Sequence, residues 1–167
     1  MQRILINALL VSGLLSIFAC DSEVQCDREP ELNVDQSILE TQIEEIETYL
    51  ESQNIDYETH SSGIRYVMLE PGVGNPPNYC AGFVADYEGR VIGDDEVFVA
   101  AIGGEFSMRS DQLAPGFKIA VNQMNRDGDY RFFIPGVLLI NRGVSNPLPV
   151  NIPDGENIEF RIRLTSY

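Results

Sequence analysis

The sequence is poor in the residues that most catalytic chemistry uses. It contains no tryptophan, one histidine and three cysteines among 167 residues. Zinc sites need clustered Cys and His, and serine or cysteine hydrolases need a base beside their nucleophile, so both classes are disfavoured. The single histidine, His60, lies in the polar turn 59–63 and is interpreted as a solvated residue. No Lys-Ser/Thr pair follows Gly103-Gly104, so a phosphate loop is not indicated either. The sequence predicts no metal and no cofactor.

Positive charge is also scarce. Eleven basic residues stand against 26 acidic ones, a formal net charge of −15. Such a surface repels nucleic acid and anionic headgroups, which excludes nucleic acid as a partner. The acidic run Asp94-Asp95-Glu96 has ligands that calcium prefers but lacks the spacing of a calcium loop, so it is interpreted as a solvated turn.

A long apolar run occurs only at the start of the chain. Arg3 precedes an uncharged stretch from residue 4 to residue 18, which is too short and wrongly flanked for a transmembrane helix and is typical of a signal peptide. Ile17-Phe18-Ala19-Cys20 resembles the lipobox of bacterial lipoproteins. This resemblance implies removal of residues 1–19, a lipid on Cys20 and attachment to a membrane of the bacterial envelope. The alternative is an ordinary secretory signal that is cut elsewhere.

The next segment, 20–36, is acidic, contains Pro30 and lacks apolar periodicity, which predicts a flexible tether. It contains Cys26, and Cys80 lies near the start of an expected strand. A Cys26–Cys80 disulfide is compatible with an oxidising envelope, although nothing in the spacing requires it.

One amphipathic helix is expected within residues 37–56. Ser37 and Glu40 form a capping-box pair, and Asn54 is suited to a left-handed stop. Apolar side chains recur between them at helical spacing, at Leu39, Ile43, Ile46 and Leu50. This stripe packs either on the following domain or on a second copy of the helix, which would make a dimer.

After the helix the apolar period changes from 3.6 to 2. Strands are expected at 64–69, 79–87, 97–101, 130–134 and 158–164, with the second ended by a turn at Glu88-Gly89. A short helix is expected at 117–124. Residues 57–167 are therefore predicted to form an α+β domain, a largely antiparallel sheet covered by one short helix.

The order of motifs in this domain resembles the FKBP-type peptidyl-prolyl isomerases. The segments that carry the resemblance are Ser62–Gly74, Phe83–Gly89, Val97-Phe98, Pro115-Gly116-Phe117 with Met124, Ile134-Pro135, Ile152-Pro153 and Asn157–Leu164. The resemblance implies a half-barrel sheet wrapped around the short helix, with an apolar pocket between them. It also implies proline-containing client polypeptides as partners.

The pocket residues follow from the same resemblance. Catalytic wall positions fall on Tyr87, Phe98 and Phe160. Substrate-binding positions fall on Phe106, Leu113, Ala114, Phe117, Ile140 and Ile152. Without the resemblance, each aromatic would be read as ordinary core packing. Such a site needs no proton-transfer residue, because a dry cavity favours the twisted amide of an X–Pro bond over the more dipolar planar amide.

Three positions depart from the family pattern. Val99 stands where active members usually carry an aspartate, Ile140 where they carry a ligand-binding tyrosine, and Asn141 where they carry glycine. The proline-rich loop Gly143–Asn151 is unusual as well. Three hypotheses result: an envelope prolyl isomerase, a degenerate binding or chaperone module on the same fold, and an unrelated β-rich structural lipoprotein.

Overall fold

The computed structural model describes residues 26–140 and 152–167. Their elements follow in chain order: α1 (Gln36–Ser52), β1 (Glu58–Thr59), β2 (Arg65–Glu70), β3 (Gly82–Val91), β4 (Val97–Arg109), the 3₁₀ turn η1 (Ser110–Gln112), α2 (Pro115–Val121), β5 (Asp129–Ile134), the 3₁₀ turn η2 (Gly136–Leu138) and β6 (Ile158–Ser166). The predictions for Cys20, Asn141 and Gly143–Asn151 lie outside the described residues.

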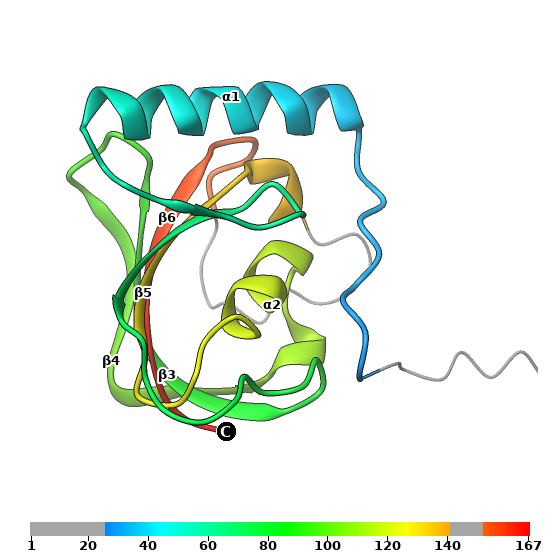
Figure 1. Cartoon of the computed structure of the whole chain (residues 1–167), viewed down its shortest axis with the longest axis vertical. Coiled ribbons are helices and arrows are strands. Elements are labelled where there is room, and N and C mark those ends of the chain that lie inside the picture. Colours follow the sequence, from blue (N-terminus) through cyan, green and yellow to red (C-terminus); the bar gives the residue numbers. More distant parts are fainter. Residues whose placement is uncertain (1–25, 141–151) are drawn as a thin grey trace, which may run out of the picture.

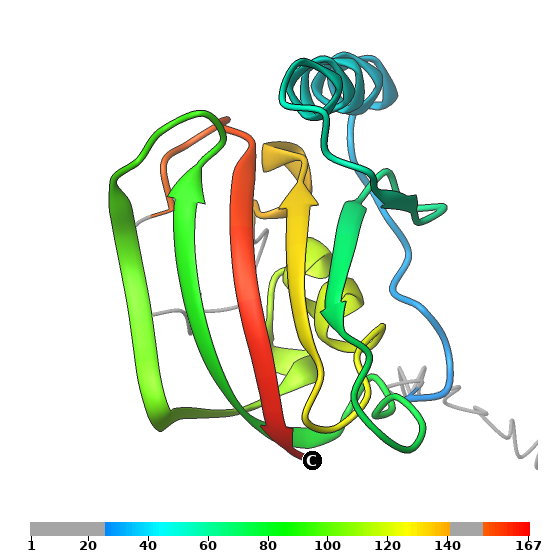
Figure 2. The same cartoon turned by 60° about the vertical axis from the view of Figure 1, so that its left-hand side comes forward.

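The strands form one antiparallel sheet in the order β1-β2-β5-β6-β3-β4. The sheet curves around α2, which lies on its concave side (Figure 1), and β4 forms one edge (Figure 2). The predicted alternation of β6 is confirmed from Phe160 onward, because Phe160, Ile162 and Leu164 are buried while Arg161 and Arg163 are exposed. Glu159 departs from it, since it is only 7% exposed and accepts a hydrogen bond from Arg131 at 2.8 Å. The main core therefore lies between the sheet and α2, as the predicted α+β class requires.

Strands β3 and β4 are longer than the sequence predicted. The turn expected at Glu88-Gly89 is wrong, because β3 continues through both residues to Val91. The pairing of β3 with β4 contains a large bulge, since Ala85 pairs with residue 106 of β4 whereas Tyr87 pairs with residue 101. Two glycines with positive φ lie within this bulge, and the Asp86 carboxylate accepts a hydrogen bond from the amide at residue 104 at 2.6 Å. A bulge of this kind bends the edge strand and prevents a regular ladder along it.

Helix α1 begins one residue earlier than predicted. The predicted Ser37–Glu40 capping box is wrong, because Asp35 is the N-cap and its carboxylate accepts hydrogen bonds from the amides of Ser37 and Ile38 at 2.9 and 3.3 Å. The Ser37 hydroxyl also donates a hydrogen bond to this carboxylate, at 2.7 Å, and together with the two amide bonds it lowers the pKa of Asp35. The predicted left-handed stop is confirmed at Asn54, which has φ 52°.

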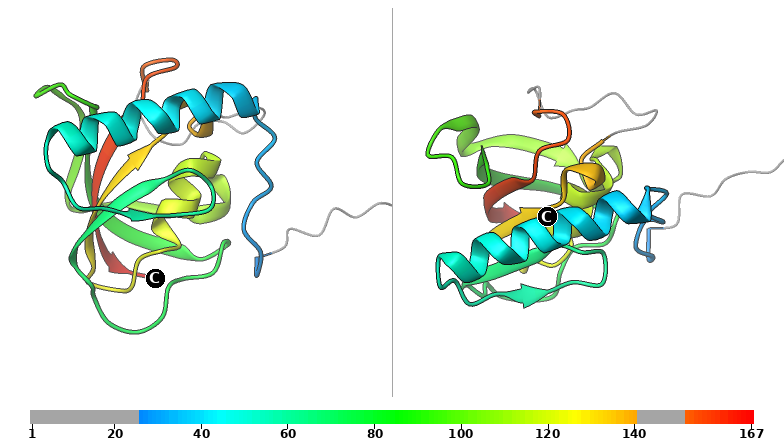
Figure 3. Two further views of the ribbon diagram at one scale, coloured as in Figure 1. Left: turned by 45° about the horizontal axis from the view of Figure 1, so that its top comes forward. Right: turned by 90° about the horizontal axis from the view of Figure 1, so that it is seen from above.

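Helix α1 lies across one end of the domain (Figure 3). Leu39 joins the main core, whereas Ile46 and Leu50 are fully buried in a second cluster with Phe133 of β5. The stripe thus packs on its own domain, the first of the two alternatives. In the part of the chain that the structure describes, no helix has the length and apolar character needed to cross a bilayer.

The N-terminal segment is joined covalently to the start of β3. Cys26 and Cys80 form a disulfide that closes a sequence separation of 54 residues, with their Cα atoms 5.0 Å apart. The amide of Tyr79 also donates a hydrogen bond to the Cys26 carbonyl at 2.9 Å. Closing a loop of this length restricts the unfolded chain, which typically stabilises the folded state by about 2–4 kcal/mol. Part of the expected flexible tether is therefore held against the domain.

Candidate functional site

Four aromatic rings from four separate elements meet between the sheet and α2. The Phe160 ring of β6 is at their centre, and its centroid lies 5.0 Å from that of Phe117, 6.2 Å from that of Tyr87 and 6.3 Å from that of Phe98. The planes of these pairs cross at 63–85°, the edge-to-face geometry that aromatic side chains favour. The structure thus brings the three predicted wall residues together with Phe117, a predicted substrate-binding residue, and we call these four residues the aromatic cluster.

Phe98 is the most exposed of the four residues in the cluster. Tyr87, Phe117 and Phe160 are at most 3% exposed, whereas Phe98 is half-buried. Burial raises the pKa of the Tyr87 phenol further above its ordinary value, which already keeps the group neutral at physiological pH. The surroundings of the cluster are therefore apolar and uncharged on its inner side, and a ligand would approach it past Phe98.

Gly89 provides the space for the central ring. A Cβ added there would lie 2.5 Å from Phe160 Cε1 and 2.8 Å from Val99 Cγ1. Both neighbours are opposite Gly89 in register, Phe160 on β6 and Val99 on β4. The glycine that the sequence suggested as a turn residue is thus needed for close packing within the strand.

We expect Gly89→Ala to displace the Phe160 ring and to destabilise the fold by about 1–3 kcal/mol, the usual cost of overpacking. Gly82→Ala is the matched control, because Gly82 lies on the same strand with no atom within 4 Å of the added Cβ. Urea unfolding of both variants measures the difference. Equal midpoints would show that the region around Phe160 can adapt to the extra methyl group.

The segment that enters α2 supplies the predicted apolar positions below the cluster. Leu113 and Ala114 are 4% and 1% exposed, and Pro115 begins the helix, where its missing amide hydrogen costs no hydrogen bond. The helix thus starts two residues before the predicted position. Gly116 lets the helix approach η2, because a Cβ there would lie 2.9 Å from Leu138 Cβ.

A pocket of about 240 Å³ opens next to this core. One wall comes from η2 and the residues after it, and the other from the segment that leads into β6. Its lining residues are Gly136, Leu139, Ile140, Ile152, Pro153, Asp154 and Gly155. We call it the rim pocket. Leu139 belongs to the main core, which also contains Phe117 and Phe160, and Ile152 packs against that core.

The rim pocket contains two predicted substrate-binding residues. Ile140 is 47% exposed and Ile152 is half-buried, so both present apolar atoms to solvent. Leu139, which the sequence did not single out, lines the pocket with them. The side chain of Phe106 lies outside what the structure describes, although its backbone pairs with Ala85 in the sheet.

Comparison with known proteins identifies this arrangement. The model of the FKBP-type peptidyl-prolyl cis-trans isomerases matches residues 81–165, about half of the chain. The chain belongs to this family. The matched segment contains all four residues of the aromatic cluster, so the rings lie on the part of the chain that defines the family.

Individual relatives agree with this assignment. The chain is 33% identical over 82 residues to a probable FKBP-type peptidyl-prolyl cis-trans isomerase, FkpA, from Neisseria meningitidis serogroup B. That match covers 48% of this chain but only 30% of the relative. The crystal structure of FkpA from Escherichia coli has a TM-score of 0.58 and 25% identity, covering 78% of this chain and 62% of that one.

A second solved structure supports the fold alone. The peptidyl-prolyl cis-trans isomerase from Pseudomonas syringae pv. tomato has a TM-score of 0.58 and 21% identity, and the likeness covers 75% of this chain and 92% of that chain. The fold expected from the motif order is confirmed. The third hypothesis, an unrelated β-rich lipoprotein, is wrong, because the chain has the FKBP fold.

The departures from the FKBP pattern make the site more apolar. Val99 is 8% exposed and faces Gly89 within the core, where a carboxylate would be removed from water. Ile140 offers no hydroxyl at the rim. A hydrogen bond that a polar side chain would make at either position is worth about 0.5–1.5 kcal/mol net.

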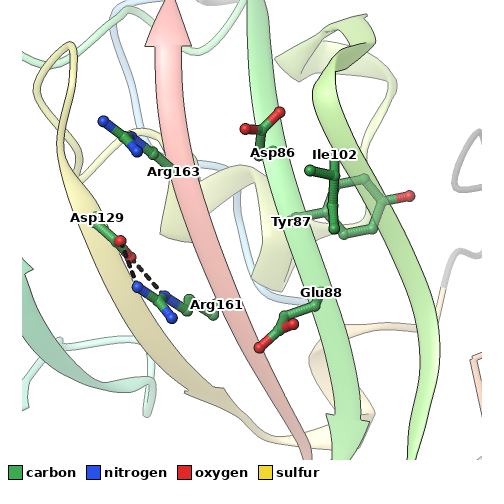
Figure 4. A pocket seen from close by; sticks show the side chains of 7 residues that line it. All are labelled: Asp86, Tyr87, Glu88, Ile102, Asp129, Arg161 and Arg163. Carbon is green, nitrogen blue, oxygen red and sulfur yellow. Dashed lines mark hydrogen bonds and ion pairs between the residues drawn. The ribbon is translucent and has the colours of Figure 1, made fainter.

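Another pocket, of about 170 Å³, lies on the outer face of the sheet (Figure 4). Its lining residues are Asp86, Tyr87, Glu88, Ile102, Asp129, Arg161 and Arg163. Arg161 donates two hydrogen bonds to the Asp129 carboxylate, at 3.0 and 2.8 Å, which raises the pKa of Arg161. Because most of this pocket is lined by the solvent-facing charges of three strands, we assign it no part in the aromatic site.

The interpretation of His60 as a solvated residue is wrong. Its side chain is 15% exposed, and its Nδ1 lies 2.9 Å from Ser62 Oγ and accepts a hydrogen bond from the Ser62 amide. The other ring nitrogen, Nε2, lies 3.2 Å from the side-chain nitrogen Nε2 of Gln123, a residue just after α2. His60 therefore ties its turn to the end of α2. Ser62 is only 3% exposed, so the pair does not present a nucleophile to solvent.

Within the described residues, no group of His, Cys, Asp and Glu could hold a metal.

Proposed function

We propose that this protein is a peptidyl-prolyl cis-trans isomerase that acts on exported polypeptides. The observation that carries the proposal is the aromatic cluster of four rings from three strands and α2, together with the open rim pocket, to which Leu139, Ile140 and Ile152 contribute apolar side chains. Family membership supports the same activity. The proline-containing segment of a client would enter past Phe98 and Ile152.

The proposed reaction requires only that the site bind the twisted amide more tightly than the planar amide. Rotation about an X–Pro bond has a barrier of roughly 18–20 kcal/mol, because amide resonance is lost. The planar ground state is the more dipolar form and gains more from water, so transfer into an aromatic, water-poor surrounding favours the twisted state. Each 1.36 kcal/mol of that preference accelerates the reaction about tenfold. The neutral phenol of Tyr87 and the phenyl groups of Phe98 and Phe160 suit this role.

The decisive experiment is a protease-coupled isomerisation assay on an Ala-Leu-Pro-Phe anilide, with residues 21–167 as the enzyme. The uncatalysed reaction takes tens to hundreds of seconds, so a faster catalysed reaction can be measured against it. We expect the observed rate to rise linearly with protein concentration. A rate equal to the background at micromolar protein would exclude catalysis.

The second candidate is a binding or chaperone module without turnover. Two departures favour it, since Val99 and Ile140 both remove polar groups that active members usually have. Such a module would still bind the peptide, so fluorescence titration of a labelled prolyl peptide distinguishes it from an inactive surface. Binding without acceleration would support this candidate over the isomerase.

The location that we propose is the bacterial envelope, with a lipid on Cys20 as the membrane anchor. The apolar run 4–18 and the lipobox-like residues before Cys20 support export, and the Cys26–Cys80 disulfide fits an oxidising compartment. Metabolic labelling with an alkyne fatty acid should mark the wild type and spare Cys20→Ser. A dimer through α1 stays a prediction, and it would have to use the exposed side of the helix, where Ile38 is 48% exposed.

A further inference from the structure

One polar side chain lies in the apolar face of α1. Gln42 is only 7% exposed, and it is one turn from Leu39 and from Ile46, both of which are buried. A buried primary amide is costly unless its donor and its acceptor are both satisfied. Its contacts therefore indicate why the helix keeps a glutamine at this position.

Gln42 joins two segments that are distant in sequence. Its Oε1 accepts a hydrogen bond from the Val137 amide in η2 at 2.9 Å. Its Nε2 donates a hydrogen bond to the Gly155 carbonyl at 2.8 Å. One planar group thus fixes η2 relative to the segment that leads into β6, with both atoms paired.

A second amide strengthens the same connection from the other side. Asn157 Oδ1 accepts a hydrogen bond from the Gly136 amide at 3.2 Å, and its Nδ2 donates to Glu45 Oε2 at 2.9 Å and to the Gln42 carbonyl at 3.4 Å. We call Gln42 and Asn157 the amide clamp. Each of its two members links α1 to η2 or to the segment before β6.

The clamped segments are the two walls of the rim pocket. Gly136 begins one wall and Gly155 ends the other. They approach so closely that a Cβ on Gly136 would lie 2.4 Å from the Glu156 carbonyl oxygen. The separation of Ile140 from Ile152 therefore depends on contacts made beneath them, which α1 completes.

We infer that Gln42 is a positioning residue that sets the width of the rim pocket for the residues flanking the client's proline. This inference rests on the proposed function. Gln42 does not line the pocket itself and acts through the Val137 amide and the Gly155 carbonyl. Helix α1 is then part of the substrate-binding apparatus as well as a packing element.

The test compares Gln42→Leu with Thr41→Val. The first variant keeps the volume and removes both hydrogen bonds. The second is its control, because Thr41 is exposed on the neighbouring face and bonds only to the Ser37 carbonyl of its own helix. In residues 21–167 we expect Gln42→Leu to raise KM for the Ala-Leu-Pro-Phe anilide about five- to tenfold with kcat changed less than twofold, since ground-state and transition-state binding weaken together. We expect Thr41→Val to behave as the wild type.

Two further variants separate positioning from simple loss of stability. Gln42→Glu keeps an acceptor for the Val137 amide but opposes the Gly155 carbonyl with a second oxygen, so it should preserve hydrogen-exchange protection at Val137 and still raise KM. Asn157→Ala should raise KM in the same direction. An unchanged KM in folded Gln42→Leu, or a fall in kcat alone, would overturn the inference.

The inference and the proposed function fail in different ways. If the wild type binds a labelled prolyl peptide but does not isomerise it, the proposed catalytic function is wrong. The inference about Gln42 is then tested by the Kd of the peptide, which should rise about five- to tenfold in Gln42→Leu. An unchanged Kd would then overturn it. A wild-type chain that binds no prolyl peptide overturns both.

Discussion

A chain that starts at Tyr57, without α1, is expected not to fold. The deletion removes Leu39, Ile46 and Leu50, which are 7%, 0% and 0% exposed, and it also removes Cys26 and with it the disulfide to Cys80. Truncating one buried Leu or Ile side chain costs about 2–5 kcal/mol, so the three together cost roughly 6–15 kcal/mol. This equals the whole stability of an ordinary domain, about 5–15 kcal/mol. Far-UV circular dichroism with urea titration of chains starting at residue 21 and at residue 57 measures the effect.

Two single substitutions on α1 test the same expectation at individual residues. Ile46→Ala removes a fully buried side chain and should lower the free energy of unfolding by about 2–5 kcal/mol. Ile38→Ala makes the same substitution at a residue that is 48% exposed, and should change it by less than about 0.5 kcal/mol. If the chain that starts at residue 57 unfolds cooperatively in urea with the same midpoint as the longer chain, α1 does not contribute to the stability of the domain.

Phe160→Leu should reduce kcat/KM for the prolyl peptide about tenfold or more. The ring is the hub of the aromatic cluster, in contact with three other rings at centroid distances of 5.0–6.3 Å. Leucine keeps the site apolar but removes the buried ring that holds Tyr87, Phe98 and Phe117 in place. A resulting loss of 1.36 kcal/mol at the transition state would give a tenfold lower rate. The full truncation Phe160→Ala should cost about 3–5 kcal/mol of stability, which makes it the less informative variant for catalysis.

The control for this prediction is Phe133→Leu. Phe133 is also 0% exposed, but it packs with Ile46 and Leu50 in the second cluster, away from the aromatic cluster. Both leucine variants should lose comparable stability in urea, about 1–2 kcal/mol. Only Phe160→Leu should lose activity at a temperature where both stay folded. Parallel losses of activity would mean that stability, and not the aromatic wall, limits the rate.

Residues close in sequence were predicted well, because their patterns follow from local geometry. The alternation of β6 and the left-handed Asn54 depend on backbone periodicity and on a few φ angles, so they could be predicted without tertiary contacts. One local prediction was wrong, the Ser37–Glu40 capping box, because Asp35 caps the helix instead. Another error arose where a residue serves a distant contact. Gly89 was read as a turn because turns favour glycine, yet it is glycine to admit the Phe160 ring.

His60 and Gln42 illustrate the same difference. His60 lies in a polar turn that reads as solvated. Its contact with Ser62 is local, but only the folded chain brings the Gln123 side chain against its Nε2. Gln42 carried a detectable signal, since a polar residue between Leu39 and Ile46 on one helical face indicates a buried hydrogen-bonding role. Its two partners could not be predicted, because they lie about a hundred positions further along the chain.

The amino-acid sequence by itself determined the acidic surface, the amphipathic helix and the order of motifs that places this chain among FKBP-type proteins. These depend on composition and on spacing along the chain. Only the tertiary structure decided that α1 packs on its own domain, that Cys26 reaches Cys80 and that one amide holds both walls of the rim pocket. Such pairings join residues far apart in the sequence, and local propensity carries no information about which distant groups become neighbours when the sheet curves around α2.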